Sequence, residues 1–382
     1  MDSELHLPHD VEYVNRFGFS GRLDQPDHLS PPYDVIHNLA KNAPQLLRAG
    51  DLGEEIARLP IIEAPVPADE LELFKMAYSF LVQAYVWEPI HLDQSGLPRT
   101  TVPMQLAKPL ISISAELDEP PTYLYSDHTI RNSRLIDSGK PAILENLKSV
   151  YTFSGTSDEN QFVVVHTAYE QVGLPAVRKA ISLMTQSHLD LSDGLDAIAA
   201  TIEQMRHEFL KVKDVVSPKI FQSNIRLYLM GWRNNLPSIR FEGARINASE
   251  LRGETGSGSA LLPFFDRFMS IMHDVEQADE NENLQTYWDF DKYRPKWHRS
   301  TLEWVAASTR IREKALQSPH CRRSYNRVVE QVARLREAHL HNVGIYLRGN
   351  AGLAFRGNYG TGGSNFATYL HALVVHNRKM MI

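Results

Sequence analysis

The sequence predicts a mostly α-helical protein in which a large helical C-terminal domain follows a smaller, mainly helical N-terminal one. Apolar residues recur at steps of three and four over several long stretches after residue 155, as they do on one face of a helix. Prolines instead crowd the first part of the chain, for example in LSPPYDVI and DEPPTYLY. Strand-like patterns are few, and the short run QFVVVHTAY is the main candidate. We therefore expect domains at residues 1–152 and 153–382.

Composition limits the classes of protein that fit. The chain has 382 residues, 43% of them apolar and 23% charged, with a formal net charge of −6 and no basic block. This balance argues against nucleic acid or an anionic membrane as the partner. Cys321 is the single cysteine, which excludes an internal disulfide and a cysteine-rich metal site. The start MDSELHLPHD does not fit a secretory signal, so we expect a cytoplasmic protein, and a monomer, with an oligomer left open.

Periodic segments give the expected helices in chain order. Apolar residues between 67 and 87 form one helix face. The segment 191–216 opens with Ser192 and Asp193 as candidate caps, and Pro218 suits the first helical position of the next segment, 217–232. A further helix is expected at 261–275, followed by a solvated loop, ADENENLQ.

The segment 325–349 contains two histidines that its helical phase separates. The stripe that faces inward consists of Tyr325, Val328, Val332, Leu335, His339, Asn342 and Tyr346. His341 lies about 200° around the axis from His339, on the wetter side. Periodicity alone favours a hydrogen-bonded core histidine at His339, with an axial haem ligand as the alternative. Arg336, one turn earlier, is either a surface arginine or the partner of an acidic group on a cofactor.

Two glycine-rich segments, RGETGSGS and GNYGTGGSNF, leave two interpretations open. Neither has the Lys before Ser/Thr that a phosphate-binding loop needs, and neither follows a clear strand in a βαβ unit. A nucleotide-binding helical protein is therefore poorly supported. Each segment is either a flexible loop or a loop that closes over a small-molecule site.

Several segments taken in order resemble the haem-containing indoleamine 2,3-dioxygenases. They are AYVWEP, ELDEPPTYLYSD, SPKIFQSNIRLYLMGW, RPKWHRSTLEWV, SYNRVVEQVARLREAHLHNVGIYL and GTGGSNF. The likeness is collinear from about Gly18 to Leu370. It implies a helical domain that holds haem b, with the small domain covering the distal side. The implied reaction inserts O2 across the indole C2–C3 bond of L-tryptophan or a related indoleamine to give N-formylkynurenine.

The resemblance also assigns roles to residues near the cofactor. His339 matches the proximal iron ligand, in agreement with the helix phase. Arg336 matches an arginine near a haem propionate, and Asp266 matches its acidic partner. The resemblance therefore implies that the cofactor lies against the inward-facing stripe of the 325–349 helix.

On the distal side the resemblance implies a substrate pocket. Phe221 and Phe162 match aromatic residues that pack on the indole, and Arg226 matches the residue that holds the substrate carboxylate, a role that suits a planar guanidinium. The remaining matches are Thr361, which closes over the substrate, Tyr125, a pocket wall, and Gly256, in the substrate-binding set. Core packing for Phe221 and a surface ion pair for Arg226 are the alternatives. Phe221 and Arg226 diverge by about 140° on a regular helix, so they can flank one pocket only if the pocket wraps around the helix or the helix is distorted.

Three positions depart from the family pattern. His166 stands where a small serine is usual, and we expect it to hydrogen bond to the indole nitrogen or to O2. His128 falls at a pocket-wall position, with a satisfied polar residue near the core as its alternative. Glu254 puts a charge near the substrate. These departures keep two further functions open: a haem-dependent oxygenase of another indole in a biosynthetic pathway, and a non-catalytic haem-binding protein.

Overall fold

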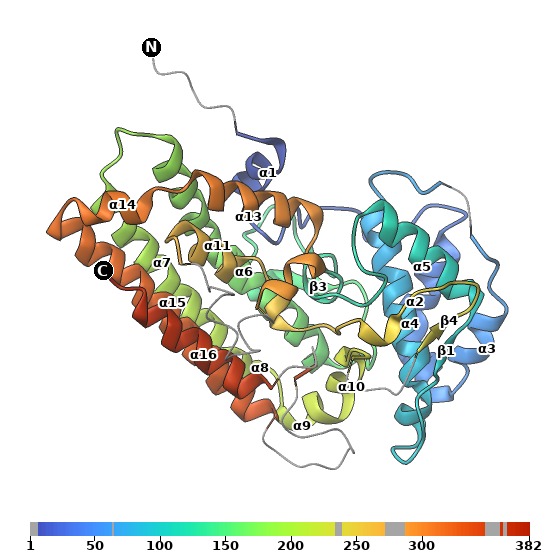
Figure 1. The fold of residues 1–382 in the computed structure, drawn as a ribbon. Helices are drawn as coiled ribbons and strands as arrows, with labels where there is room; N and C mark the ends of the chain where they lie inside the picture. The colour runs from blue at the N-terminus through green and yellow to red at the C-terminus, as the bar shows by residue number, and fades with distance from the viewer. Residues whose placement is uncertain (1–6, 63–64, 234–238, 272–286, 348–359, 362–364) are drawn as a thin grey trace.

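Helices make up most of the computed structural model, which describes residues 7–62, 65–233, 239–271, 287–347, 360–361 and 365–382. Two groups of helices lie side by side, the larger one built around the long helices α6, α7 and α15 and the smaller around α2 and α4 (Figure 1). The mostly α-helical class predicted from the sequence is confirmed. Within the described residues, none of the helices combines the length and apolarity that crossing a bilayer demands.

The smaller group is centred on α4, which is buried on nearly every side. Its helices are α2 (Asp34–Ala49), α3 (Leu52–Ala57), α4 (Leu71–Leu92) and α5 (Met104–Glu116). The sequence predicted one apolar face for α4, but even Lys75 and Gln83 on its other faces are buried. Because α2, α3 and α5 all pack against it, α4 is the central helix of this group.

Strands are short, and the strand considered at QFVVVHTAY is wrong. β1 (Thr101–Val102) pairs in parallel with β4 (Arg240–Phe241), and β2 (Ser133–Leu135) pairs antiparallel with β3 (Leu147–Ser149). The QFVVVHTAY run lies instead within α6 (Ser157–Thr185). The Thr156 hydroxyl caps α6 by accepting the Glu159 N–H, and the three valines of the run are buried, so tertiary packing overrides their β-branched preference.

The larger group continues from α6 to the C-terminus. Its helices are α7 (Leu191–Leu210), α8 (Val212–Val215), α9 (Pro218–Ile220), α10 (Arg226–Leu229), α11 (Leu261–Phe268), α13 (Lys296–Ser308), α14 (Ile311–Leu316), α15 (Pro319–Leu347) and α16 (Phe366–Lys379). The cap of α7 is Asp190 and not Ser192 or Asp193, because the Asp190 carboxylate accepts the Asp193 N–H. Pro218 stands at the first helical position, as predicted. The expected ADENENLQ loop lies outside the described residues.

The short π- and 3₁₀-helical turns matter most for the site. They are η1 (Ser126–Ile130), η2 (Leu144–Asn146), η3 (Phe221–Ile225), η4 (Ala248–Glu250), η5 (Gly256–Gly258) and η7 (Asp291–Tyr293). η1 and η3 are π-helical, a form found mostly as single turns and often at functional sites.

Two hydrophobic cores cross the predicted boundary at residue 152. α1 (His9–Phe17) packs in the core of the larger helix group through Val11 and Val14 and rests on α13. Conversely, buried apolar side chains between Val212 and Trp232 join the core around α4. The two-domain division at residues 1–152 and 153–382 stays a prediction.

Candidate functional site

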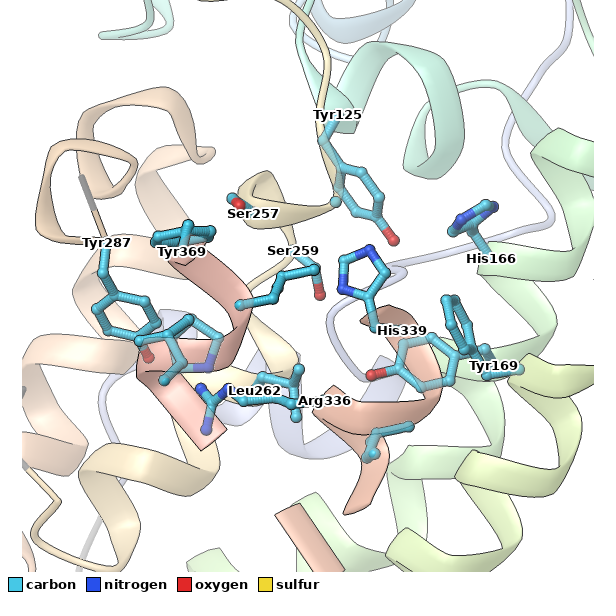
Figure 2. A pocket seen from close by; sticks show the side chains of 16 residues that line it. Tyr125, His166, Tyr169, Ser257, Ser259, Leu262, Tyr287, Arg336, His339 and Tyr369 are labelled. Atoms are coloured by element: carbon cyan, nitrogen blue, oxygen red, sulfur yellow. The ribbon is translucent and has the colours of Figure 1, made fainter. Parts of the chain in front are cut away.

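A cavity opens between α6, α7, α15 and α16 and is closed on one side by the η5 turn. Two adjoining pockets share His166, Phe209, Gly256, His339 and Tyr369 in their linings. In Figure 2 the rings of Tyr125, His166 and His339 surround the same space, with Arg336 lying toward Tyr287.

His339 borders the cavity, and His341 is exposed, as the helix phase predicted. Burial lowers the pKa of His339 to about 4, so its imidazole is neutral at physiological pH. Among the described residues, none forms a hydrogen bond to its ring, which leaves the hydrogen-bonded core histidine unsupported. A Cβ added at Gly256 would lie 3.4 Å from Nε2, so this nitrogen faces η5. A neutral imidazole of this kind on a rigid helix fits an axial haem ligand.

One turn before His339, Arg336 is buried against Asp266 of α11. Both side chains are about 1% exposed, and Arg336 Nη1 lies 3.0 Å from Asp266 Oδ1 while Nη2 donates to Oδ2. Asn377 and Tyr287 also donate to the Asp266 carboxylate. Burial opposes the charge on Arg336, but Asp266 more than offsets it, so the pKa of Arg336 is raised. Arg336 is thus a buried, permanently charged group in the cavity wall, and the surface-arginine alternative is wrong.

His166 projects from α6 into the same cavity with a defined tautomer. Its Nδ1 lies 2.7 Å from the carbonyl oxygen of Phe162. Because a carbonyl oxygen only accepts, Nδ1 must donate, and burial lowers the pKa of His166, which keeps the ring neutral. The remaining nitrogen, Nε2, therefore carries a lone pair and can accept a hydrogen bond in the cavity, but it cannot donate one.

Phe162 and Phe221 meet at the other end of the cavity, where the π turn η3 bends the chain. Their ring centroids are 4.9 Å apart, and both line the larger pocket. The Arg226 N–H donates to the Phe221 carbonyl, five residues back, so the helix is distorted here, which is one of the two conditions under which Phe221 and Arg226 could flank one pocket. Arg226 itself is half-buried and is absent from both pocket linings, and its Nη1 donates to Gln222 at 3.4 Å. Its role as a carboxylate ligand stays a prediction.

The loop that carries Glu254 and Gly256 is positioned by the close approach of two backbone segments, at Gly231 and Gly253. A Cβ on Gly253 would lie 2.1 Å from the Gly231 nitrogen, so only glycine permits this approach of two backbones. The Gly231 N–H in turn donates to the Thr361 carbonyl at 3.0 Å. As a result Glu254, Gly256 and Thr361 all line the larger pocket, and both glycine-rich segments reach the cavity, as the closing-loop interpretation predicted.

Tyr125 is positioned by buried polar groups on both sides. Its hydroxyl donates to Glu170 Oε1 at 3.2 Å, and the Ser259 hydroxyl donates to the same oxygen at 2.6 Å. Burial raises the pKa of Glu170 to about 7, against the effect of these two hydrogen bonds. On its other side, the η1 turn is held by Asp127, which accepts from Arg131, Ser79 and the Leu124 N–H and pairs with Lys75.

His128 lies in η1 and lines neither of the two pockets, but it meets the alternative of a satisfied polar residue only in part, because its Nε2 has no hydrogen-bond partner among the described residues. Its Nδ1 lies 3.0 Å from the Tyr123 hydroxyl, and burial lowers its pKa to about 3. The pocket-wall interpretation of His128 is therefore wrong: the side chain points into the packing around Tyr123 and Phe162.

Among the residues of the site that were not singled out from the sequence are Phe209, Glu170 and Tyr369. Phe209 lies in the segment 191–216, for which only a helix was expected. Glu170 follows His166 by four residues, and such a pair shares one helix face, so the spacing offered a signal. Tyr369 offered none, because its place in the wall depends on how α16 packs against α15.

Comparisons with known proteins find relatives over most of the chain. The sequence model of the indoleamine 2,3-dioxygenases matches residues 9–373. Indoleamine 2,3-dioxygenase 1 of Rattus norvegicus is 28% identical over 99% of this chain and 95% of the relative. An indoleamine 2,3-dioxygenase of Penicillium citrinum is 27% identical over 89% of this chain and 81% of its own. A 6-hydroxytryptophan 2,3-dioxygenase of Fusarium equiseti is 24% identical over 82% of this chain and 78% of its own.

Proposed function

The chain belongs to the indoleamine 2,3-dioxygenase family, a family of haem-dependent dioxygenases, and on that premise we propose that it inserts both atoms of O2 across the indole C2–C3 bond of L-tryptophan or a related indoleamine. The product from L-tryptophan is N-formylkynurenine. We propose haem b as the cofactor, which when bound supplies the iron that activates O2.

The observation that carries this proposal is the pair of neutral histidines on one cavity. His339 has no protein hydrogen bond among the described residues, and its Nε2 is turned toward the η5 turn, where a Cβ added at Gly256 would lie 3.4 Å away. His166, on α6, brings a lone pair to the same cavity. A purely structural histidine would satisfy its buried nitrogens within the protein.

The chain's own residues then have separate tasks. His339 holds the iron, and Arg336, fixed by Asp266, offers a positive charge to an acidic edge of the cofactor. Phe162 and Phe221 pack on the indole ring.

At the indole ring, the Nε2 of His166 accepts a hydrogen bond from the indole N–H. The tautomer of His166 leaves no proton on Nε2, so this nitrogen does not donate to O2. Thr361 and Arg226 hold the amino acid end, and Gly256 leaves room between His339 and the loop.

The test uses His339→Ala and product mass. Wild-type protein should show a Soret band, and L-tryptophan should give a product heavier by two oxygen atoms. His339→Ala should lose stable haem binding, whereas His341→Ala, on the exposed side of the same helix, should keep it. A normal Soret band in His339→Ala would refute the ligand assignment. Haem binding without turnover of any indole would leave a non-catalytic haem-binding protein instead.

A second candidate is the oxygenation of another indole derivative in a biosynthetic pathway. Glu254 favours it, since a buried acid in the pocket wall restricts which substituents fit, and one relative is named for 6-hydroxytryptophan. A product that gains one oxygen atom, or no reaction with L-tryptophan beside turnover of a substituted indole, would favour this candidate. The cytoplasmic location, the monomeric state and the absence of nucleic-acid and membrane partners stay predictions.

A further inference from the structure

Glu254 is a buried acid in the wall of the larger pocket. It is 6% exposed, and it lines the pocket together with Phe162, Phe221 and Thr361. The crossing of Gly253 over Gly231, described above, fixes the backbone next to it. Because the backbone beside it is fixed, the Glu254 side chain stays in the pocket wall, at the end of the cavity that Phe162, Phe221 and Thr361 line.

Glu254 also differs from the other buried carboxylates that the structure describes. Each of the others has an ion pair or hydrogen bonds within the protein: Glu88, Glu119, Asp127, Glu159, Glu170 and Asp266. Among the described residues, none forms an ion pair or a hydrogen bond with the Glu254 carboxyl. Burial alone raises its pKa to about 8. Buried acids are normally paired, so a carboxyl left unpaired beside a cavity points to a partner that arrives with the ligand.

The chemistry of the cavity indicates what that partner is. Aromatic rings at Phe162 and Phe221 suit a flat ring, and the neighbouring histidines are neutral because burial lowers their pKa values. A protonated primary amine supplies both a positive charge and three donors, which a carboxylate accepts. Indoleamines carry such a group two carbons from the indole ring.

We propose that Glu254 is the ion-pair partner of the substrate's ammonium group and so determines specificity for indoles that bear a protonated amine. This inference rests on the proposed function. The family resemblance implies other residues of the pocket wall. Glu254 adds to them an acidic contact that recognises the amine directly. Carboxylate-bearing indoles without an amine should gain nothing from Glu254, because a negative charge nearby keeps the buried acid protonated.

The experiment measures equilibrium binding to the ferric, haem-loaded protein by dialysis, without turnover. The ligands are tryptamine (an amine without a carboxylate), indole-3-propionate (a carboxylate without an amine) and the neutral 3-methylindole. In Glu254→Gln the Kd of tryptamine should rise by about 10- to 100-fold, as expected for loss of a hydrogen bond to a charged group. The Kd values of 3-methylindole and indole-3-propionate should both stay within about twofold, because neither ligand brings a charge that favours the ionised Glu254.

Glu250→Gln is the matched control, because Glu250 lies on the same segment but is exposed. It should leave all three Kd values within about twofold. Equal weakening of tryptamine and 3-methylindole in Glu254→Gln would mean that Glu254 only shapes the cavity, and would overturn the inference, as would no change at all.

The wild-type protein gives a check that does not depend on the variant folding. It should bind tryptamine at least about tenfold more tightly than 3-methylindole. Comparable affinities would overturn the role of Glu254 while leaving the proposed function intact, since the indole ring would still bind. Failure of the haem-loaded wild type to bind any of the indoles would overturn the proposed function as well.

Discussion

Replacing Asp266 with alanine tests the buried charge pair beside the cavity. The guanidinium of Arg336 and the carboxylate of Asp266 are both about 1% exposed, so Asp266→Ala leaves a charge buried without its main counter-charge. Such a loss costs about 3–5 kcal/mol. The hydrogen bonds that Asn377 and Tyr287 donate to Asp266 disappear too, at about 1 kcal/mol each. We expect the free energy of unfolding to fall by at least about 3 kcal/mol, a large share of the roughly 5–15 kcal/mol typical of native proteins.

The assay is urea unfolding of the haem-free protein, followed by tryptophan fluorescence and far-UV circular dichroism, whose transitions must coincide. Arg378→Ala is the control, because Arg378 forms ion pairs with Glu330 and Glu337 while remaining 40% exposed. Exposed pairs contribute about 1 kcal/mol or less, so this variant should unfold almost like the wild type. A loss below about 1 kcal/mol in Asp266→Ala, comparable to the control, would refute the reasoning. The double variant Asp266→Leu, Arg336→Leu should lose less stability than the sum of the single changes, since neither charge is then stranded.

Two further predictions concern the glycine crossing and the buried histidine of η1. Gly253→Ala should lower the free energy of unfolding by at least about 1–3 kcal/mol and weaken indole binding, because its Cβ would meet the Gly231 backbone at 2.1 Å. The control is Gly139→Ala, whose Cβ meets only a flexible Asp137 oxygen at 3.3 Å and which should change stability by less than about 0.5 kcal/mol in the same urea titration. Equal effects of the two substitutions would contradict the argument. His128 has a pKa of about 3 in the folded protein against about 6.5 unfolded, so its neutral form stabilises the fold above pH 6.5 and that contribution is lost as pH falls toward 3. Between pH 7.5 and pH 5 the wild type should therefore lose about 2 kcal/mol more than His128→Asn in urea unfolding, and an identical pH dependence of the two proteins would show that His128 is not held neutral by burial.

Short-range patterns predicted much of the fold and the direction of key side chains. The 3.6-residue period of α15 placed His339 toward the cavity and His341 toward solvent. The same kind of reasoning named a distorted helix as one of two ways for Phe221 and Arg226 to flank one pocket, and η3 is such a distortion. It failed where local preference and packing disagree: the β-branched valines of QFVVVHTAY lie in α6 because that helix is capped by Thr156 and buried on several sides.

Which polar groups remain without partners could be decided only by the tertiary structure. Helix phase left His339 as a core histidine or an iron ligand, because the groups around its ring come from other elements, such as Phe209 of α7 and Gly256 of η5. The same holds for Glu254, whose carboxyl has no partner among the described residues, and for His128, which packs beside Tyr123 instead of lining the two pockets. Periodicity and family likeness act along the chain, so the sequence determined most of the helices and some of the residues around the cavity. Hydrogen bonding and desolvation act through space, so only the folded chain decided which of those residues are free to meet a ligand.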